Sequence, residues 1–561
     1  MMRTVCALAA AAVVMVAASP SVPAAPEDSL RKRDRLYDPK EQMLLYPEGG
    51  GQWIHTHIQK APVRPTRASI RYAADLFDAG GEDRIARGRK VLAKILRLQD
   101  TDPKSRTYGI WSYFLEEPLD KMNNPDWNWA DFIGLELTRI LAGHADRLPP
   151  DLLKRTRSGL AHACESILRR NVGLGYTNIA MLDCAVTATA GHLLDAPKYL
   201  DYGRDKLRRM IDFVEHHGSF TEYNSPTYTM VTVEACEHVL AHVEDAAARD
   251  AADTLRRMAW TLITQHYHPG TAQWAGPHAR CYRDHLAPGT AEEWIRLGKT
   301  SDHRGCPPDM APRLRRLPRD PLTVRNRFYH GGEKRLNIVG TTHFTAEACL
   351  GSVSYEDLWY QRRVVLGYWT MPRSRPAVVR LRLLKDGQDF ASAVAHTVQD
   401  GFRVLAATAF VTGRGEYHPS IGRPKDGVFR GSDFRLRWEV TADGAEATRL
   451  SGRRFELTAG GYAAVVHAVP GYFGDREIAW TCGTKDGRAF VDAVCYEGEE
   501  RAWRFDDFGP VLIASGLELV PADASPSDAR PAVRREDGEA KRIEWANLAL
   551  PVPPTGRPYR R

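Results

Sequence analysis

The stretch YTNIAMLDCAVTATAGHLLDAPKYLDYGRDKLRRMIDFVEHHG, residues 176–218, decides the fold class of the N-terminal half. Apolar residues recur at helical spacing over 176–193 and again over 197–216. A short turn that contains Asp and Pro joins the two segments, and Gly218 ends the second one. The pattern therefore predicts two antiparallel helices that form a hairpin.

Helical periodicity continues on both sides of this hairpin, from about residue 69 to residue 300. Helices are predicted at about 151–170, 226–246 and 248–267, and no strand pattern intervenes. The hairpins follow one another without a strict residue repeat, which favours a closed ring of hairpins over a regular solenoid. Both would satisfy the periodicity. We predict an (α/α) toroid over residues 25–320.

The spacing of apolar residues changes after about residue 320. Short β-branched or alternating runs such as LNIVGTTHF (336–344) and VLIASGLELV (511–520) are separated by Gly, Asp and Pro. Many such runs predict an antiparallel β-sandwich over residues 321–530. The last segment, 531–561, is rich in Arg, Pro and Asp, and we predict an extended C-terminal tail.

The N-terminus has the pattern of a secretory signal. One Arg precedes an apolar run, and the small residues Val22 and Ala24 lie where a signal peptidase cleaves. Polar sequence follows at once, and no other stretch approaches the roughly 18 apolar residues of a membrane span. We predict a signal peptide over 1–24, export to the periplasm or the medium, and no membrane span.

Charge and cysteine content narrow the class of ligand. Lys plus Arg number 77 against 70 for Asp plus Glu, a net charge of +7. This mild excess suits an anionic ligand and falls short of a nucleic-acid-binding protein. The cysteines after the signal are too sparse for a disulfide scaffold, although Cys482 and Cys495 could bridge neighbouring strands.

The stretch HGSFTEYNSPTYTM, residues 217–230, places many hydrogen-bonding groups between two predicted helices. Ser225 and Pro226 have the chemistry of a helix start, as N-cap and first helical residue. Tyr228 then lies in the first turn, where the helix dipole should lower the pKa of a phenol from about 10. Helix caps alone do not need the further polar residues of this connection, which are Glu222, Tyr223 and Asn224.

Two more polar and aromatic segments, 107–134 and 273–286, also lie at predicted helix ends, and Asn178 begins a helix. Exposed tryptophans offer flat faces for sugar rings, and arginine pairs with carboxylate or sulfate through two parallel hydrogen bonds. Together these segments predict a cleft for an acidic carbohydrate. The candidate residues are Trp111, Trp127 and Trp129 in the first segment and His278, Arg280, Tyr282 and Arg283 in the second.

A resemblance to a known group of enzymes lies in the same segments. The run WNWADFIGLELTRIL, from Trp127, resembles the Asn-Trp-Trp…Ile-Gly helix start of chondroitin AC and hyaluronate lyases. Gly218-Ser219-Phe220 is similar to the start of their Asp-Gly-Ser-Phe-x-Gln-His segment. The wider group, with heparinase II/III-like and alginate or glucuronan lyases, combines an (α/α) toroid with an antiparallel β-sandwich. The resemblance rests on sequence motifs in residues 107–285 and, in the remainder, only on the pattern of predicted helices and strands.

The resemblance implies a polysaccharide lyase that cleaves by β-elimination at a uronic acid, without a cofactor or metal. By position, Asn178 resembles the family's Asn, which neutralises the C5 carboxylate together with an Arg, and Arg280 lies near that Arg. Tyr228 lies near the proton-transferring Tyr. The chain has Glu222-Tyr223 in place of Gln-His. The resemblance therefore leaves Tyr223, Tyr228 or His278 as the group that transfers the proton.

Two other functions fit the same composition. A glycoside hydrolase would use two carboxylates, such as Glu117 or Asp131 with Glu222, on either side of the scissile bond. A non-catalytic carbohydrate-binding protein would use the aromatic residues alone. Metal chemistry is not indicated, because no Cys or carboxylate follows the pairs His216-His217 and His266-x-His268 at ligand spacing.

Overall fold

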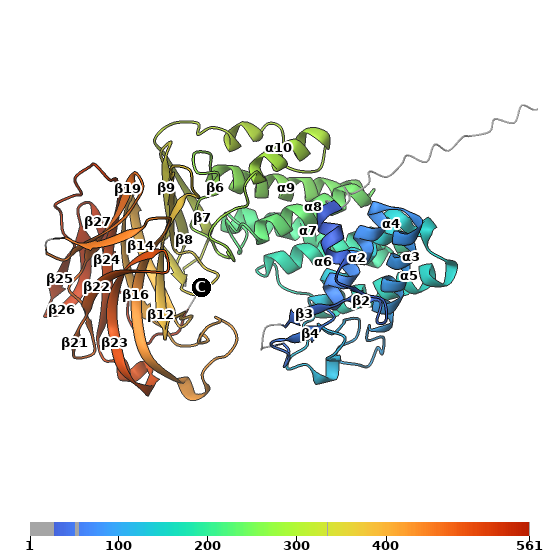
Figure 1. The fold of residues 1–561 in the computed structure, drawn as a ribbon, viewed down its shortest axis with the longest axis horizontal. Coiled ribbons are helices and arrows are strands. Elements are labelled where there is room, and N and C mark those ends of the chain that lie inside the picture. Colours follow the sequence, from blue (N-terminus) through green and yellow to red (C-terminus); the bar gives the residue numbers. More distant parts are fainter. Residues whose placement is uncertain (1–26, 51–54, 334, 451, 560–561) are drawn as a thin grey trace, which may run out of the picture.

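The structure is a computed structural model that describes residues 27–50, 55–333, 335–450 and 452–559. The predicted signal peptide lies outside these residues. Figure 1 shows a helical N-terminal half beside a C-terminal half built of strands. This is the predicted combination of an (α/α) toroid and an antiparallel β-sandwich. Among the described residues, no helix has the length and apolar character needed to cross a membrane.

The helical half consists mainly of consecutive α-helices with short connections. Their bounds are α1 Glu27–Asp34, α2 Thr66–Ala79, α3 Glu82–Arg97, α4 Trp129–His144, α5 Pro150–Arg170, α6 Thr177–Leu194, α7 Pro197–His217, α8 Tyr228–His242, α9 Ala246–His266 and α10 Thr290–Thr300. The hairpin of α6 and α7 confirms the prediction from residues 176–218. Gly218 ends α7 with a φ of 92°, a left-handed conformation that glycine adopts without strain.

The helices form an inner and an outer layer. The inner helices α2, α4, α6 and α8 pack against one another in chain order, and α3, α5, α7 and α9 pack outside them. Each inner helix is followed by an antiparallel outer helix, so the N-terminal ends of the inner helices lie on one side of the toroid. Hydrogen bonds connect these ends, as Trp129 Nε1 donates to Thr66 Oγ1 over 3.0 Å. Positive ends of four helix dipoles thus gather where an anion would be favoured.

Within its described residues, the second half contains two antiparallel sheets of nine strands each. The main strands of the first, in spatial order, are β10 Tyr355–Asp357, β14 Ala393–Asp400, β15 Arg403–Phe410, β24 Val511–Pro521, β19 Tyr462–Ala468, β18 Arg454–Ala459 and β17 Glu446–Arg449. Those of the second are β22 Ala479–Lys485, β23 Arg488–Arg504, β16 Val428–Thr441, β12 Ala377–Lys385, β11 Val365–Trp369, β9 Ala348–Val353, β8 Ile338–Phe344 and β7 Leu322–Tyr329.

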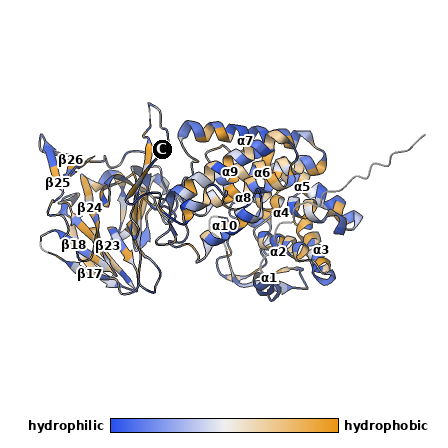
Figure 2. Ribbon diagram, turned by 90° about the horizontal axis from the view of Figure 1, so that it is seen from above, coloured by the Kyte–Doolittle hydropathy of each residue, from blue (hydrophilic) through white to orange (hydrophobic). Residues whose placement is uncertain are grey.

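The two sheets share one apolar core. Phe410 of β15 meets Phe434 of β16 edge to face, with ring centroids 5.9 Å apart. The same cluster of buried residues continues into the helical half through Phe328 of β7 and Tyr223. Hydrophobic residues, drawn in orange in Figure 2, lie along the packed faces of helices and strands. This hydrophobic contact holds the helical half against the sandwich at the junction of the two halves.

Two sequence predictions need correction here. In place of an extended tail, three antiparallel strands follow the sandwich: β25 Ala532–Glu536, β26 Glu539–Trp545 and β27 Leu548–Pro551. Ile543, Trp545 and Leu550 are buried against the first sheet, so apolar alternation outweighs the polar composition of the segment. Cys482 and Cys495 are both free thiols. Cys482 pairs with Val491 in the ladder, out of register with Cys495.

A loop of the helical half pairs with a loop of the sandwich. After the small hairpin of β5 Tyr267–His268 and β6 Gln273–Trp274, the chain crosses to the sandwich and forms an isolated antiparallel bridge between His278 and Arg363. Cys281 N–H also donates to the carbonyl of Gln361 over 2.6 Å. These backbone bonds hold Arg280 at the junction of the two halves.

Candidate active site

Tyr228 is the first residue of α8 and stands at the junction of the two halves. Ser225 caps this helix end, because its Oγ accepts from Tyr228 N–H over 2.9 Å and donates to the carbonyl of Arg280 over 2.7 Å. Ser225 thus satisfies one free N–H of the helix start, but the N-cap residue is Thr227, so the sequence placed the start of this helix two residues too early. The Ser225 side chain ties the helix start to the loop that carries Arg280.

Arg280 is the centre of the polar cluster. Its Nη1 donates to Glu222 Oε1 over 3.0 Å, its Nε to Gln361 Oε1 over 2.6 Å and its Nη2 to the Tyr228 hydroxyl over 3.0 Å. The guanidinium also lies over two aromatic rings, 4.5 Å from the centroid of Tyr228 and 5.1 Å from that of Trp359. All three nitrogens are thus engaged by protein groups, and the orientation of the guanidinium is fixed.

Tyr228 and Tyr282 form a pair of phenols beside this guanidinium. Their hydroxyl oxygens lie 2.7 Å apart, and Arg280 Nη2 is also 3.5 Å from the Tyr282 oxygen. Tyr282 is 46% exposed, so the pair connects a protected phenol to one that is open to solvent. A proton can pass between the two oxygens along a single hydrogen bond.

The expected lowering of the Tyr228 pKa is wrong. Burial raises the pKa of this phenol well above its usual value, and the opposing effect of Arg280 does not offset it. The helix start is visible in the sequence, but the loops that cover the ring come from other parts of the chain. Tyr228 is consequently a protonated phenol at neutral pH, suited to donate a proton.

Glu222 and Asn178 lie on the other side of Arg280. Glu222 Oε2 accepts from the backbone N–H of Asn178 over 2.8 Å, which joins the 217–230 segment to the start of α6. The Asn178 side chain is buried, and within the described residues its Oδ1 has no hydrogen-bond partner. A buried amide oxygen without a partner calls for an explanation, and an ordered water or a ligand can supply one.

Four predicted site residues are buried and have structural contacts. Tyr223 is fully buried and stacks on Phe328 with centroids 4.1 Å apart, and Trp111 donates to the carbonyl of Ile95 inside the helical core. Asn224 donates to the carbonyls of Ala275 and Pro277, and so holds the two loops together.

The ring of His278 lies between the carbonyl oxygens of Asn224 and Trp274, and burial lowers its pKa to about 3. Both ring nitrogens face protein carbonyls, so this neutral imidazole is not free to exchange a proton with a substrate. Burial therefore removes His278, Tyr223, Trp111 and Asn224 from the residues that we expect to touch one.

The remaining predicted residues lie in two places. Trp127 and Trp129 are half-buried at the start of α4, where Trp129 stacks on Tyr113 with ring centroids 3.9 Å apart. The guanidinium of Arg106 lies 5.2 Å from the Trp127 ring centroid. Arg283 is exposed, and no hydrogen bond or ion pair joins its side chain to another of the described residues.

Several residues of the site carry no signal that sequence reasoning detected. Trp359 and Gln361 come from a sandwich loop about eighty residues after Arg280 in the chain, and only the fold brings them under its guanidinium. The hydroxyl of Tyr176 accepts from Asn128 Nδ2 over 3.1 Å at the adjoining ends of α4 and α6. Asn128 lies within the polar segment 107–134, whereas Tyr176 lies two residues before Asn178, the residue that the sequence singled out at this helix start.

His418 of the sandwich also approaches the site. Its ring centroid lies 5.1 Å from that of Trp359, and its Nδ1 accepts from Ser420 N–H over 3.1 Å. Burial, together with the charges of Arg280 and Arg414, lowers the pKa of His418 to about 4. The imidazole is therefore neutral, with its hydrogen on Nε2.

Each carboxylate that a hydrolase would need has a neighbour within the protein, although Glu117 Oε2 and Asp131 Oδ1 lack a hydrogen-bond partner among the described residues. Glu117 is buried and accepts from both the backbone N–H and Nδ1 of His57. Asp131 is buried beside Asp183, and Glu222 bonds Arg280. No group of His, Cys, Asp or Glu side chains suited to a metal ion occurs in the parts of the chain that the structure describes.

The chain is similar to one family model and to solved structures of other proteins. A family model described as a domain of unknown function, DUF8769, matches residues 26–288. No curated protein matches the chain. The crystal structure of heparinase III is similar with a TM-score of 0.44 and 11% identity, over 96% of this chain and 92% of that chain.

A second solved structure, heparan sulfate lyase HepC from Pedobacter heparinus, is similar with a TM-score of 0.35 and 8% identity. The likeness covers 87% of this chain and 81% of that one. Both likenesses span the helical and the β-sheet half.

Proposed function

We propose that the protein is a polysaccharide lyase that cleaves an acidic, uronate-containing polysaccharide by β-elimination. The observation that carries the proposal is the cluster in which Arg280 contacts both Tyr228 and Tyr282. Two phenols that share a hydrogen bond beside a fixed cation suit a reaction with two proton transfers and no nucleophile. The sequence resemblance in residues 107–285 points to the same chemistry.

The reaction needs a base at C5 and an acid at the leaving oxygen. In the proposed mechanism the exposed Tyr282 oxygen, as a phenolate beside Arg280, takes the C5 proton. The electrons of the broken C5–H bond form the C4–C5 double bond, and the C4–O4 bond breaks. Tyr228 gives its proton to O4. The hydrogen bond of 2.7 Å then returns a proton from Tyr282 to Tyr228 and restores the starting state.

The C5 proton becomes acidic enough only when the neighbouring carboxylate is neutralised. Arg280 was expected to do this, but all of its nitrogens are engaged within the protein. We assign it the role of stabilising phenolate charge. Asn178, which lies at the start of α6, is the group we propose to face the substrate carboxylate by donating from its amide nitrogen, with the inner helix ends adding favourable dipoles.

The test is a panel of uronate-containing polysaccharides, including alginate, glucuronan, hyaluronan, chondroitin and heparin. A lyase product carries a conjugated double bond and absorbs ultraviolet light, whereas a hydrolase releases reducing ends without absorbance. Release of reducing sugar alone would refute the lyase and favour the hydrolase. Binding with no cleavage of any polymer would favour a carbohydrate-binding protein.

We also propose that the enzyme is exported, because residues 1–24 have the pattern of a signal peptide. N-terminal sequencing of the mature protein from the periplasm or medium should begin near Ala25. An intact Met1 on cytoplasmic protein would contradict export.

A further inference from the structure

A cavity lies beside the phenol pair, with Tyr282 in its lining. It has a volume of about 340 Å³ and opens between the residues that precede α8 and the loop from Cys281 to Ala287. Pro226 and Thr227 form one wall, and Trp274 and Tyr368 contribute to the lining. The volume lies within the range of small-molecule sites, which is roughly 300–1,000 Å³.

Tyr282 belongs both to this cavity and to the proposed active site. Its ring lines the cavity, while its hydroxyl bonds Tyr228. A molecule in the cavity therefore lies directly next to the atoms that would transfer protons. The exposed ring offers a flat apolar face of the kind on which sugar rings pack.

The charged residues of the cavity differ in how they are paired. Asp284 bonds Arg363 over 2.7 Å and Arg380 over 3.1 Å, and this chain of ion pairs continues through Glu439 into the sandwich. Burial alone would raise the pKa of Asp284, but Arg363 and Arg380 hold it below its usual value. Two arginines thus neutralise the negative charge of Asp284 at the cavity.

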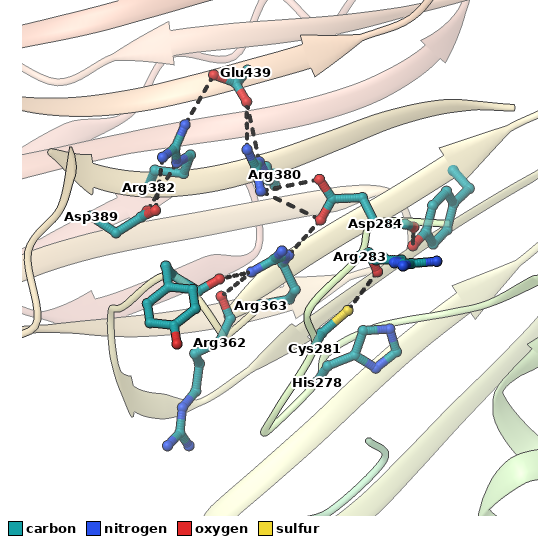
Figure 3. Close-up of polar contacts among 12 residues, drawn as sticks. His278, Cys281, Arg283, Asp284, Arg362, Arg363, Arg380, Arg382, Asp389 and Glu439 are labelled. Atoms are coloured by element: carbon teal, nitrogen blue, oxygen red, sulfur yellow. Dashed lines mark hydrogen bonds and ion pairs between the residues drawn. The ribbon is translucent and has the colours of Figure 1, made fainter. Parts of the chain in front are cut away.

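Arg283 lines the same cavity, and its positive charge is not paired with a carboxylate of the described residues. Figure 3 shows its side chain pointing away from the Asp284 ion pairs, and no contact joins its guanidinium to them. Within the described residues its side chain has no hydrogen-bond or ion-pair partner, although its carbonyl accepts from the Cys281 thiol over 2.8 Å. A rigid loop therefore presents a free guanidinium at the edge of an aromatic cavity. A guanidinium can donate two parallel hydrogen bonds to a carboxylate or a sulfate.

We propose that this cavity is a separate saccharide subsite, in which the unit next to the scissile bond packs on Tyr282 while Arg283 pairs with its carboxylate or sulfate. The inference rests on the proposed function and deepens it. The substrate then carries an anionic group on two neighbouring units. One is the uronate at Asn178, and the other lies on the unit at Arg283.

The experiment measures binding separately from catalysis. A tetrasaccharide of glucuronic acid is titrated into Tyr228→Phe protein by calorimetry, because this variant should not consume the ligand. Adding Arg283→Gln should weaken binding about tenfold or more, the effect of losing one charged hydrogen bond. Arg319→Gln, at an exposed arginine outside the cavity lining, is the matched control and should change nothing.

Two further measurements separate this subsite from a general effect of charge. A carboxyl-reduced tetrasaccharide, which is neutral, should not distinguish Arg283→Gln from its parent. Ala287→Trp places a large ring at the exposed rim of the cavity and should block the acidic tetrasaccharide without changing the start of α8.

The outcomes distinguish the two proposals. If Arg283→Gln binds the acidic tetrasaccharide as the parent does, or if the parent does not bind it at all, the subsite is overturned. Binding that depends on Arg283, with no unsaturated product from any polysaccharide, would retain the subsite and refute the lyase.

Discussion

The hydroxyl of Tyr228 lies 2.7 Å from the hydroxyl of Tyr282, with Nη2 of Arg280 within 3.0 Å of the first oxygen and 3.5 Å of the second. The two hydroxyls are joined by one hydrogen bond and lie beside one cation. Negative charge that forms on either oxygen meets the same guanidinium. Acid and base roles can therefore be divided between the two phenols without a histidine.

Replacing Tyr228 with Phe should abolish most activity and leave the fold intact. The ring keeps its packing under Arg280, and only the donated proton is lost. Turnover should fall by at least about 100-fold, which is typical of losing a general acid. Initial rates of ultraviolet absorbance measure turnover, and urea unfolding measures stability. Near-normal turnover per folded molecule would show that the active site lies elsewhere.

Arg280→Lys should be almost as damaging as Arg280→Ala. The guanidinium makes three directed hydrogen bonds, to Glu222, Gln361 and Tyr228, and one ammonium group cannot reach all three. A preorganised donor of this kind contributes roughly 100- to 1,000-fold in rate. Arg403→Lys, at a sandwich arginine that bonds Glu518, is the control. Recovery of activity by lysine would mean that positive charge alone suffices.

The rate should remain high at alkaline pH. A general acid must be protonated, and burial raises the pKa of Tyr228 above its usual value of about 10. The alkaline decline in kcat/KM should consequently begin above about pH 10. A profile of initial rates against pH measures this limb. A decline with a midpoint below about pH 9 would assign the acid role to a different group.

Much of the fold could be predicted from sequence because local periodicity determines it. The spacing of apolar residues over 176–218 gives the α6–α7 hairpin, and the alternation in 511–520 gives β24. The C-terminal segment shows how composition can mislead. Its many polar residues suggested a tail, although the alternating Ile543 and Trp545 already indicated a strand.

The site was only partly predictable because it joins distant segments. Tyr228, Arg280 and Glu222 were visible as polar residues at helix ends, and the structure brings them into contact. Their partner Gln361 comes from a sandwich loop that no local pattern connects to them. Burial was the other unknown, because Trp111 and a cleft-lining tryptophan look alike in sequence.

Lys206 should be among the most important residues for stability in the helical half. It is fully buried, bonds Asp183 and donates to the Tyr202 hydroxyl over 2.8 Å. Lys206→Met leaves a buried carboxylate without its cation, which costs about 3–5 kcal/mol. Lys198→Met is the matched control on the same helix, because its pair with Glu165 is exposed and contributes less than about 1 kcal/mol. Equal losses in urea unfolding would contradict a buried ion pair.

Asp131→Asn tests the protonation state of the same cluster. Burial and the neighbouring Asp183 raise the pKa of Asp131 well above its usual value, so we expect it to be neutral in the folded protein and to donate to Asp183. As pH rises past about 4, the unfolded chain loses this proton while the folded protein keeps it. The parent therefore loses stability with rising pH until the folded pKa is reached, and the Asn variant does not. In urea unfolding between about pH 4 and pH 7, the free energy of unfolding of the Asn variant should increase relative to that of the parent as pH rises. A difference that stays constant over this range would mean that Asp131 is already ionised in the folded state.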